Sequence, residues 1–254
     1  MTYRHIRIAF ILISCMLIAG NFMSYIPIAC FFITLALFLS ILFIGSAFIC
    51  SQFYTKVICR DIRARNKNVF ITFDDSPDKT ETPLVLEVLK KHDIKATFFI
   101  IGEKAEENIE LVKEIAGQGH VLGNHSYSHK NYFPLRSTKK IIKEIKKTDN
   151  LINSVRLSER IVFRPPFGVT NPSIAKAIKR LKVYTIGWSL KSFDTVTKKR
   201  ERVLKRLINR TRPGDIVLLH DPVKNIHIVL DKYIEFLKKN NYNFETVDKL
   251  LSNE

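Results

Sequence analysis

Two histidines four residues apart, His125 and His129, are spaced so that both imidazoles can point to the same side of a turn or helix. A carboxylate from a distant part of the chain would complete a three-ligand site with one position left open for water. This is the pattern of a catalytic site for a divalent metal ion. Zinc suits such donors best, and cobalt or iron(II) also accept imidazole and carboxylate ligands.

Polar segments follow five of the short apolar runs, most of them directly and Asp194 a few residues further on. They are Asp74-Asp75, His125-Ser126-Tyr127-Ser128-His129, Arg164-Pro165-Pro166-Phe167-Gly168, Trp188 with Asp194, and His220-Asp221. An Asp-Asp pair alone is usually a turn or helix cap, and a His-x3-His pair alone is usually on the surface. Three of the seven histidines nevertheless fall at such positions. If the runs are parallel strands, these segments meet at one face of the sheet, which favours a common site.

The elements that would position these residues alternate regularly after residue 67. Runs of strand length are found at 69–73, 96–100, 121–124, 161–163, 183–187, 215–219 and 243–246. Amphipathic stretches of helical length lie between them, at 83–92, 104–118, 139–155, 173–181, 200–211 and 226–239. Strict alternation predicts an α/β fold class with a parallel sheet and helical crossovers, either open and doubly wound or closed as a barrel.

Four motifs, in order along the chain, resemble those of the polysaccharide deacetylase family, also called the NodB-homology family or carbohydrate esterase family 4. They are Thr72-Phe73-Asp74-Asp75-Ser76-Pro77, His125-Ser126-Tyr127-Ser128-His129, Arg164-Pro165-Pro166-Phe167-Gly168 and Leu218-Leu219-His220. The resemblance covers residues 68 to 248. It implies a distorted (β/α) barrel of about seven parallel strands. It also implies an enzyme, a metal-dependent carbohydrate N-deacetylase that hydrolyses an N-acetyl group on an amino sugar.

The resemblance also implies roles for individual residues. Asp75, His125 and His129 correspond to the metal ligands, and Asp74 corresponds to the general base. Arg164 resembles the arginine that orients this base, a role that suits its rigid fork of donors.

The remaining roles concern the leaving group and the substrate. His220 resembles the general acid that protonates the sugar amine, and Asp194 resembles the carboxylate that orients either His220 or Arg164. Backbone N–H groups around Phe167 would stabilise the oxyanion. Leu218 resembles the wall of the acetyl pocket, and Trp188 lies where it can fill part of the site.

The chain departs from the family pattern at two places. Ser76 stands where the first motif usually has glycine. A further family motif, between the third and the last of those named above, is usually Asp-x-x-Asp-Trp; here it is Lys191-Ser192-Phe193-Asp194-Thr195, which lacks the first Asp and the Trp. These departures concern contacts with the substrate and leave the predicted ligands, base and acid in place.

The first 60 residues contain no acidic residue, and residues 8–55 contain no charge at all. A membrane-spanning helix needs roughly 20 apolar residues, so this stretch predicts a hairpin of two transmembrane helices, at about 8–22 and 28–49. A single pass and a signal peptide are the alternatives for this segment. We therefore expect a membrane anchor at 1–55, a basic juxtamembrane linker at 56–67 and a deacetylase domain at 68–254.

The numbers of lysines and arginines near the membrane segments predict on which side of the membrane the domain lies. Arg4 and Arg7 precede the first pass, the turn has none, and five follow the second pass: Lys56, Arg60, Arg63, Arg65 and Lys67. By the positive-inside rule a hairpin would then have both ends in the cytoplasm, whereas a single uncleaved pass would place the domain outside. The four cysteines all precede residue 60, and we interpret them as small apolar residues in or beside the membrane segments.

The chain carries 41 Lys+Arg against 24 Asp+Glu. These basic residues are spread over helix faces, such as Lys139-Lys140, Lys143 and Lys146-Lys147, without a recognised nucleic-acid module. We therefore predict no nucleic-acid partner. The expected partners are the membrane and an N-acetylated glycan or lipid-linked amino sugar. The alternative function is a catalytically silent, glycan-binding membrane protein that retains the deacetylase fold.

Overall fold

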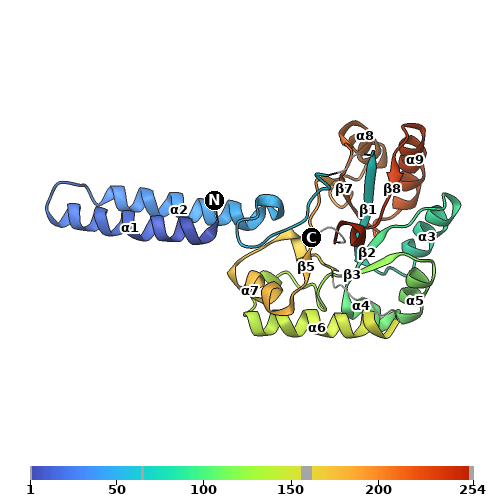
Figure 1. Ribbon diagram of the computed structural model, residues 1–254, viewed down its shortest axis with the longest axis horizontal. Coiled ribbons are helices and arrows are strands. Elements are labelled where there is room, and N and C mark those ends of the chain that lie inside the picture. Colours follow the sequence, from blue (N-terminus) through green and yellow to red (C-terminus); the bar gives the residue numbers. More distant parts are fainter. Residues whose placement is uncertain (1, 64–65, 156–161, 252–254) are drawn as a thin grey trace.

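The computed structural model describes residues 2–63, 66–155 and 162–251, and a curled parallel sheet lies at the centre of its larger part (Figure 1). The strands found among these residues are β1 (Asn68–Ser76), β2 (Thr97–Ile100), β3 (Val121–Asn124), β4 (Val162–Phe163), β5 (Tyr184–Thr185), β6 (Leu190–Lys191), β7 (Ile216–His220) and β8 (Asn243–Phe244). Their order is β5-β4-β3-β2-β1-β7-β6, with β8 beside the start of β1, and all these pairings are parallel. The predicted distorted barrel of about seven parallel strands is confirmed.

The helices that connect the strands form the outer layer. They are α3 (Glu81–Lys91), α4 (Gly102–Glu107), α5 (Ile109–Gly117), α6 (Thr138–Val155), α7 (Pro172–Leu181), α8 (Arg200–Arg210) and α9 (Ile226–Lys239). The single helix expected at 104–118 is two helices, because Asn108 leaves the helical conformation at φ −138°. Strand β6 was not predicted, because its two residues, Leu190 and Lys191, do not belong to an apolar run. Ile161, the expected start of the fourth strand, lies outside the described residues.

Alternation along β1 decides which side chains reach the site. Val69, Ile71 and Phe73 pack outward against the helices in the main hydrophobic core. Successive side chains of a strand point to opposite faces, so Phe70, Thr72 and Asp74 point into the barrel. Phe70 belongs to an apolar cluster with Phe99, Val162, Ile186, Ile216, Val247 and Leu251. This cluster fills one end of the barrel, and the polar residues at the carboxyl ends of the strands lie at the other.

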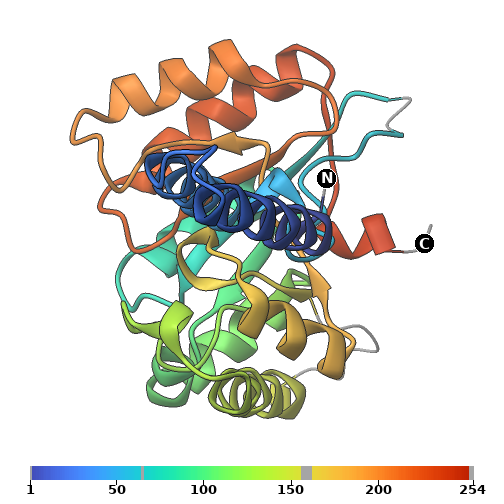
Figure 2. The same cartoon turned by 90° about the vertical axis from the view of Figure 1, so that its left-hand side faces the viewer.

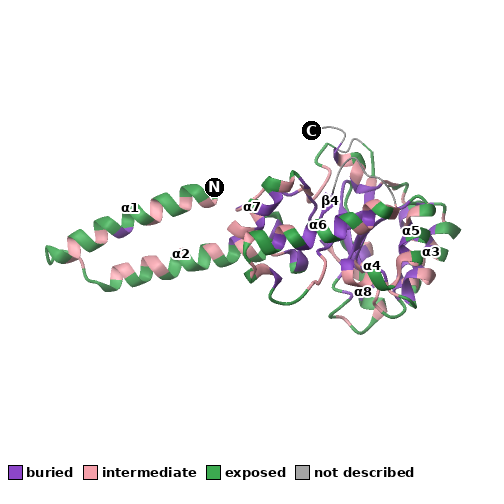
Figure 3. Cartoon of the chain, turned by 90° about the horizontal axis from the view of Figure 1, so that it is seen from below, coloured by how far each residue is buried: buried purple, intermediate pink, exposed green. Residues whose placement is uncertain are grey.

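Two apolar helices, α1 (Tyr3–Phe22) and α2 (Ala29–Ala47), form an antiparallel hairpin that projects from the α/β region (Figures 1 and 2). Each is long and apolar enough to cross a membrane. Figure 3 shows that most of the hairpin surface is exposed or half-buried, and large apolar side chains such as Met16, Phe22 and Phe43 are more than two thirds exposed. Such a large apolar surface is not stable in water and requires an apolar partner.

The segment after the hairpin is folded against the barrel. Ile58 forms a parallel bridge with Ile186, and Arg60 forms an antiparallel bridge and an ion pair with Asp215. Val57 is 3% exposed. The basic segment 56–67 is thus in part an additional edge of the sheet. Arg65 of this segment lies outside the described residues.

Two of the four cysteines form a disulfide, Cys50–Cys59. The expectation that all four are unpaired apolar residues is therefore wrong for this pair, and it holds for Cys15 and Cys30, which are free. The pairing arises because residues 57–60 run beside β5 and bring Cys59 back to the end of the hairpin. This contact depends on the tertiary structure, so spacing alone did not indicate it.

Candidate active site

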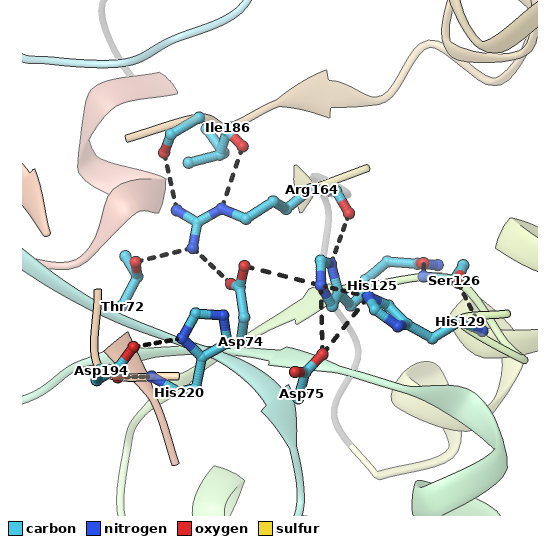
Figure 4. A network of polar contacts seen from close by, with 12 residues as sticks. Thr72, Asp74, Asp75, His125, Ser126, His129, Arg164, Ile186, Asp194 and His220 are labelled. Carbon is cyan, nitrogen blue, oxygen red and sulfur yellow. Dashed lines mark hydrogen bonds and ion pairs between the residues drawn. The ribbon is translucent and has the colours of Figure 1, made fainter. Parts of the chain in front are cut away.

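Asp75, His125 and His129 converge at the carboxyl ends of β1 and β3 (Figure 4). The Nε2 atoms of the two histidines are 3.2 Å apart. Oδ1 of Asp75 lies 3.7 Å from Nε2 of His125 and 3.5 Å from Nε2 of His129. Donors that bind a tetrahedral zinc ion at 2.0–2.2 Å are separated by roughly 3.4 Å from one another. The three predicted ligands therefore have the spacing that one such ion requires.

The chemistry of the donor atoms also fits a cation. Oδ1 of Asp75 is buried and has no hydrogen-bond partner among the described residues, which is costly for a carboxylate oxygen unless an ion binds it. Nδ1 of His125 lies 2.7 Å from the carbonyl oxygen of Arg164. That contact requires the proton on Nδ1 and leaves the Nε2 lone pair free for a metal. Burial, together with the neighbouring His125, lowers the pKa of His129 to about 4, so this imidazole is neutral at pH 7.

The backbone that carries these donors is strained. Asp75 has φ 66° and His129 has φ 45°, in the left-handed region that residues other than glycine rarely adopt. Such conformations persist only where neighbouring contacts enforce them, and they cluster at functional sites. Lys104 of α4 is one such neighbour, since its Nζ donates to the backbone oxygen of Asp75 at 2.7 Å.

Glu144 of α6 supports the loop between the two histidines. Its carboxylate accepts hydrogen bonds from the backbone N–H of Ser128 at 2.8 Å and from the Ser128 hydroxyl at 3.0 Å. Arg136 pairs with the same carboxylate at 3.2 Å. Sequence reasoning missed Glu144, although a signal was present: it is a charged residue next to Ile141 and Ile145 on the buried face of an amphipathic helix.

Asp74 and Arg164 form a buried ion pair on the barrel side of the ligands. Nη1 of Arg164 lies 2.6 Å from Oδ1 of Asp74 and 2.9 Å from the hydroxyl of Thr72. The other guanidinium nitrogens donate to the carbonyls of Ile186 and Gly187. Burial by itself raises the pKa of Asp74, but the charge and hydrogen bond of Arg164, together with the charges of the two neighbouring histidines, outweigh it, and the net pKa is lowered. Asp74 is therefore ionised at neutral pH and its carboxylate is held in one orientation.

His220, at the end of β7, is the register neighbour of Asp74 on the adjacent strand β1 and is paired with Asp194. Its Nδ1 lies 2.8 Å from Oδ1 of Asp194, and its backbone N–H donates to Oδ2 at 2.7 Å. Of the two partners left open for Asp194, the structure therefore brings it to His220. Burial tends to lower the pKa of His220, but the hydrogen bond and charge of Asp194 raise it above its usual value.

The three residues assigned to substrate contacts lie around this set. Phe167 is 46% exposed, has φ 61°, and its ring centroid is 4.8 Å from that of His129. Trp188 packs directly on Gly168, where a Cβ would lie 2.3 Å from the indole ring. Leu218 pairs with Thr72 and is two residues before His220, so it points into the barrel on the same face as His220.

Asp221 was not assigned a role from the sequence. It is fully buried, and it accepts a hydrogen bond from the Thr82 hydroxyl at the start of α3. Burial raises the pKa of Asp221 to about 7. The residue links the end of β7 to the helix that follows the Asp74-Asp75 turn. Its position directly after His220 was visible in the sequence, but its contact with Thr82 was not.

Comparison with known proteins identifies the family. A family profile described as polysaccharide deacetylase matches residues 61–186. A peptidoglycan-N-acetylglucosamine deacetylase of Bacillus cereus is 34% identical over 202 residues, which cover 78% of this chain and 94% of that protein. The chain belongs to the polysaccharide deacetylase family. PgdA of Listeria monocytogenes, a peptidoglycan-N-acetylglucosamine deacetylase, is 35% identical over 73% of this chain, but the chain spans only 39% of its length.

A solved structure of this deacetylase family bears on the alternative function. A protein of Bacillus anthracis, described as a CE4 family pseudoenzyme, has a TM-score of 0.71 and 31% sequence identity, covering 77% of this chain and 69% of that chain. A mutant of it is described as having restored enzymatic activity. A member of the deacetylase family can thus keep the fold without activity.

Proposed function

We propose that this protein is a membrane-anchored, metal-dependent N-deacetylase that removes the acetyl group from an amino sugar in a polysaccharide, peptidoglycan or lipid-linked glycan. The observation that carries the proposal is the convergence of Asp75, His125 and His129 beside the Asp74–Arg164 pair, with His220 next to Asp74 on the neighbouring strand. The names of the relatives support the substrate class, since several are peptidoglycan deacetylases.

The ligand set would be Asp75, His125 and His129, and zinc is the ion that we propose. Cobalt and iron(II) accept the same imidazole and carboxylate donors, so metal analysis has to choose among them. A bound divalent ion would polarise the acetyl carbonyl and lower the pKa of a water molecule toward neutrality.

Asp74 would act as the general base. Its carboxylate is ionised and oriented by Arg164, and it takes a proton from water while the water oxygen bonds to the acetyl carbon. Arg164 does not exchange its proton, because a guanidinium stays charged in proteins. The backbone N–H of Phe167 would donate to the oxygen that becomes negative.

His220 would act as the general acid. Asp194 holds its Nδ1 and raises its pKa, which favours the protonated ring that a general acid requires. Nε2 then gives its proton to the sugar nitrogen as the carbon–nitrogen bond breaks. The products are acetate and the free amine, and Leu218 and Trp188 would form the wall around the acetyl group and sugar.

Membrane anchoring is the second part of the proposal. The hairpin of α1 and α2 exposes a long apolar surface, and each helix has the length of a bilayer core. We propose that residues 1–55 anchor a deacetylase domain that comprises residues 68–254. A signal sequence is the competing assignment, and comparing the mass of the membrane-extracted protein with that of the full chain distinguishes the two.

The test is deacetylation by the purified full-length protein on a panel of chitin oligomers, peptidoglycan fragments and a polyprenyl-linked N-acetylhexosamine. Acetate release that depends on a divalent metal and is abolished in Asp75→Ala is the expected result. Glycan binding without acetate release from any substrate, in protein that carries its metal, would favour the silent alternative that the Bacillus anthracis pseudoenzyme represents.

A further inference from the structure

The disulfide Cys50–Cys59 lies at the junction between the hairpin and the α/β region. Cys50 belongs to the short 3₁₀ helix η1 (Ile49–Ser51), directly after α2, and Cys59 belongs to the segment that runs beside β5. Both cysteines are thus on the α/β side of the second apolar helix. Whatever compartment contains the disulfide also contains the catalytic residues.

The fold itself brings the two cysteines together. The backbone N–H of Ile58 donates to the carbonyl of Thr185 at 2.9 Å, and that of Gly187 donates to the carbonyl of Ile58 at 2.8 Å. Ile49 and Val57 are almost fully buried beside the pair, and a Cβ on Gly187 would lie 2.6 Å from Sγ of Cys59. The Cα atoms of the cysteines are 6.0 Å apart, within the range for disulfides. The pairing is therefore part of a packed structure.

Disulfides form and persist in oxidising compartments outside the cytoplasmic membrane, whereas cytosolic thiols are kept reduced. The lysine and arginine distribution instead predicts a cytoplasmic domain, because the segment 56–67 after α2 contains five basic residues. That rule, however, applies to short loops, and long domains cross the membrane largely regardless of charge. About 190 residues follow the basic segment, so the disulfide is the stronger of the two indicators.

The end of α2 also contacts the rim of the site. The hydroxyl of Ser46 donates to the carbonyl of Thr170 at 2.6 Å, and the N–H of Thr170 donates to the carbonyl of Ser46 at 3.1 Å. Thr170 is buried and lies three residues after Phe167, so the two Cα atoms are at most about 11 Å apart. Since α2 has the length of a membrane span, the site lies close to the lipid headgroups.

We infer that the catalytic domain lies on the outer face of the membrane, with both ends of the hairpin outside and its uncharged turn at residues 23–28 in the cytoplasm. The inference rests on the proposed function for its substrate: an N-acetylated amino sugar presented outside the cell within reach of the membrane surface. It excludes a lipid-linked intermediate at the inner leaflet.

The side of the membrane can be measured without enzyme activity. In full-length protein that carries Cys15→Ser and Cys30→Ser, the additional change Cys59→Ser leaves Cys50, which is exposed, as the one thiol. We expect a membrane-impermeant maleimide to label Cys50 of this variant on intact cells. The protein with only Cys15→Ser and Cys30→Ser, which keeps the Cys50–Cys59 disulfide, should be labelled only after reduction. Labelling that requires permeabilised cells would overturn the inference.

A second measurement covers the case in which the cysteine variant does not fold. A reporter that is active only outside the cytoplasm is fused after Glu254 of the wild-type chain, and a reporter active only inside is fused at the same place as its control. Signal from the outside reporter is expected. Signal from the inside reporter alone would contradict the inference.

A third measurement tests the substrate. Turnover of chitin oligomers, which do not cross the membrane, is compared between intact and permeabilised cells. Equal turnover is expected, with none in Asp75→Ala cells. A several-fold rise on permeabilisation would place the site inside. Labelling outside together with no turnover in either preparation would keep the topology and reject chitin oligomers as substrate.

Discussion

The two halves of the site differ in whether their polar atoms have partners within the protein. On one side Asp75, His125 and His129 direct three acceptor atoms at each other across 3.2–3.7 Å, and Oδ1 of Asp75 has no hydrogen-bond donor among the described residues. On the other side the two carboxylates have partners in the protein: Asp74 pairs with Arg164, and Asp194 pairs with His220.

This difference indicates which side chains need a bound cation and which do not. Three acceptors that face one another repel unless a cation lies between them. The paired half is electrostatically complete, so it should keep its geometry whether or not an ion is bound. Substitutions in the first half should therefore abolish metal binding, and substitutions in the second half should lower the rate and leave the metal in place.

The largest effect is expected from removing a ligand. Asp75→Ala and His129→Ala should lower the metal content of the purified protein from about one ion per chain to none and reduce turnover to background. His227→Ala is the matched control, because His227 contacts Glu81 away from the ligand set. Elemental analysis of all three proteins decides. Equal metal content in the ligand variants and the control would show that these residues are not the ligands.

The next effect separates the base from the ligand beside it. Asp74→Asn should retain the metal and lose about 10²- to 10⁴-fold in turnover, the usual contribution of a general base. His220→Ala should behave in the same way as the general acid. Metal content and kcat are measured on the same preparations. If Asp74→Asn loses its ion as Asp75→Ala does, the roles of the two carboxylates have to be exchanged.

A smaller effect is expected on the pH profile. His220 must be protonated to act as the acid, so kcat should fall as pH rises through its raised pKa. Asp194→Asn removes the neighbouring charge and lowers that pKa, so the alkaline limb should move to lower pH. The measurement is kcat against pH for both proteins. An alkaline limb that stays in place would assign it to another group.

The smallest effect should come from the contact behind the histidine loop. Glu144→Gln weakens the support of Ser128 and the pairing with Arg136, and we expect roughly a 10-fold loss of metal affinity, as for other groups that hold a ligand in place. Glu110→Gln is the control, because Glu110 is highly exposed and pairs only with Lys113 among the described residues. Titration of the metal-free proteins with Zn²⁺ measures the metal affinity of each. Identical affinities would limit Glu144 to a role in folding.

Much of this protein could be predicted from local pattern. The alternation of apolar runs and amphipathic stretches determined the α/β class, since strand and helix periods are properties of a few consecutive residues. The His-x3-His spacing and the Asp74-Asp75 pair determined the candidate metal chemistry. The two apolar helices were also predictable, because long uncharged apolar runs are visible in the sequence itself.

The tertiary structure decided which distant groups meet. Asp194 had two possible partners, and the adjacent β6 and β7 bring it to His220, 26 residues away. Glu144 reaches the histidine loop because α6 packs against the end of β3, and Cys59 reaches Cys50 because residues 57–60 run beside β5. These contacts depend on how whole elements pack against one another. A sequence pattern describes the faces of each element, but the pairing of those faces follows only from the folded arrangement of all of them.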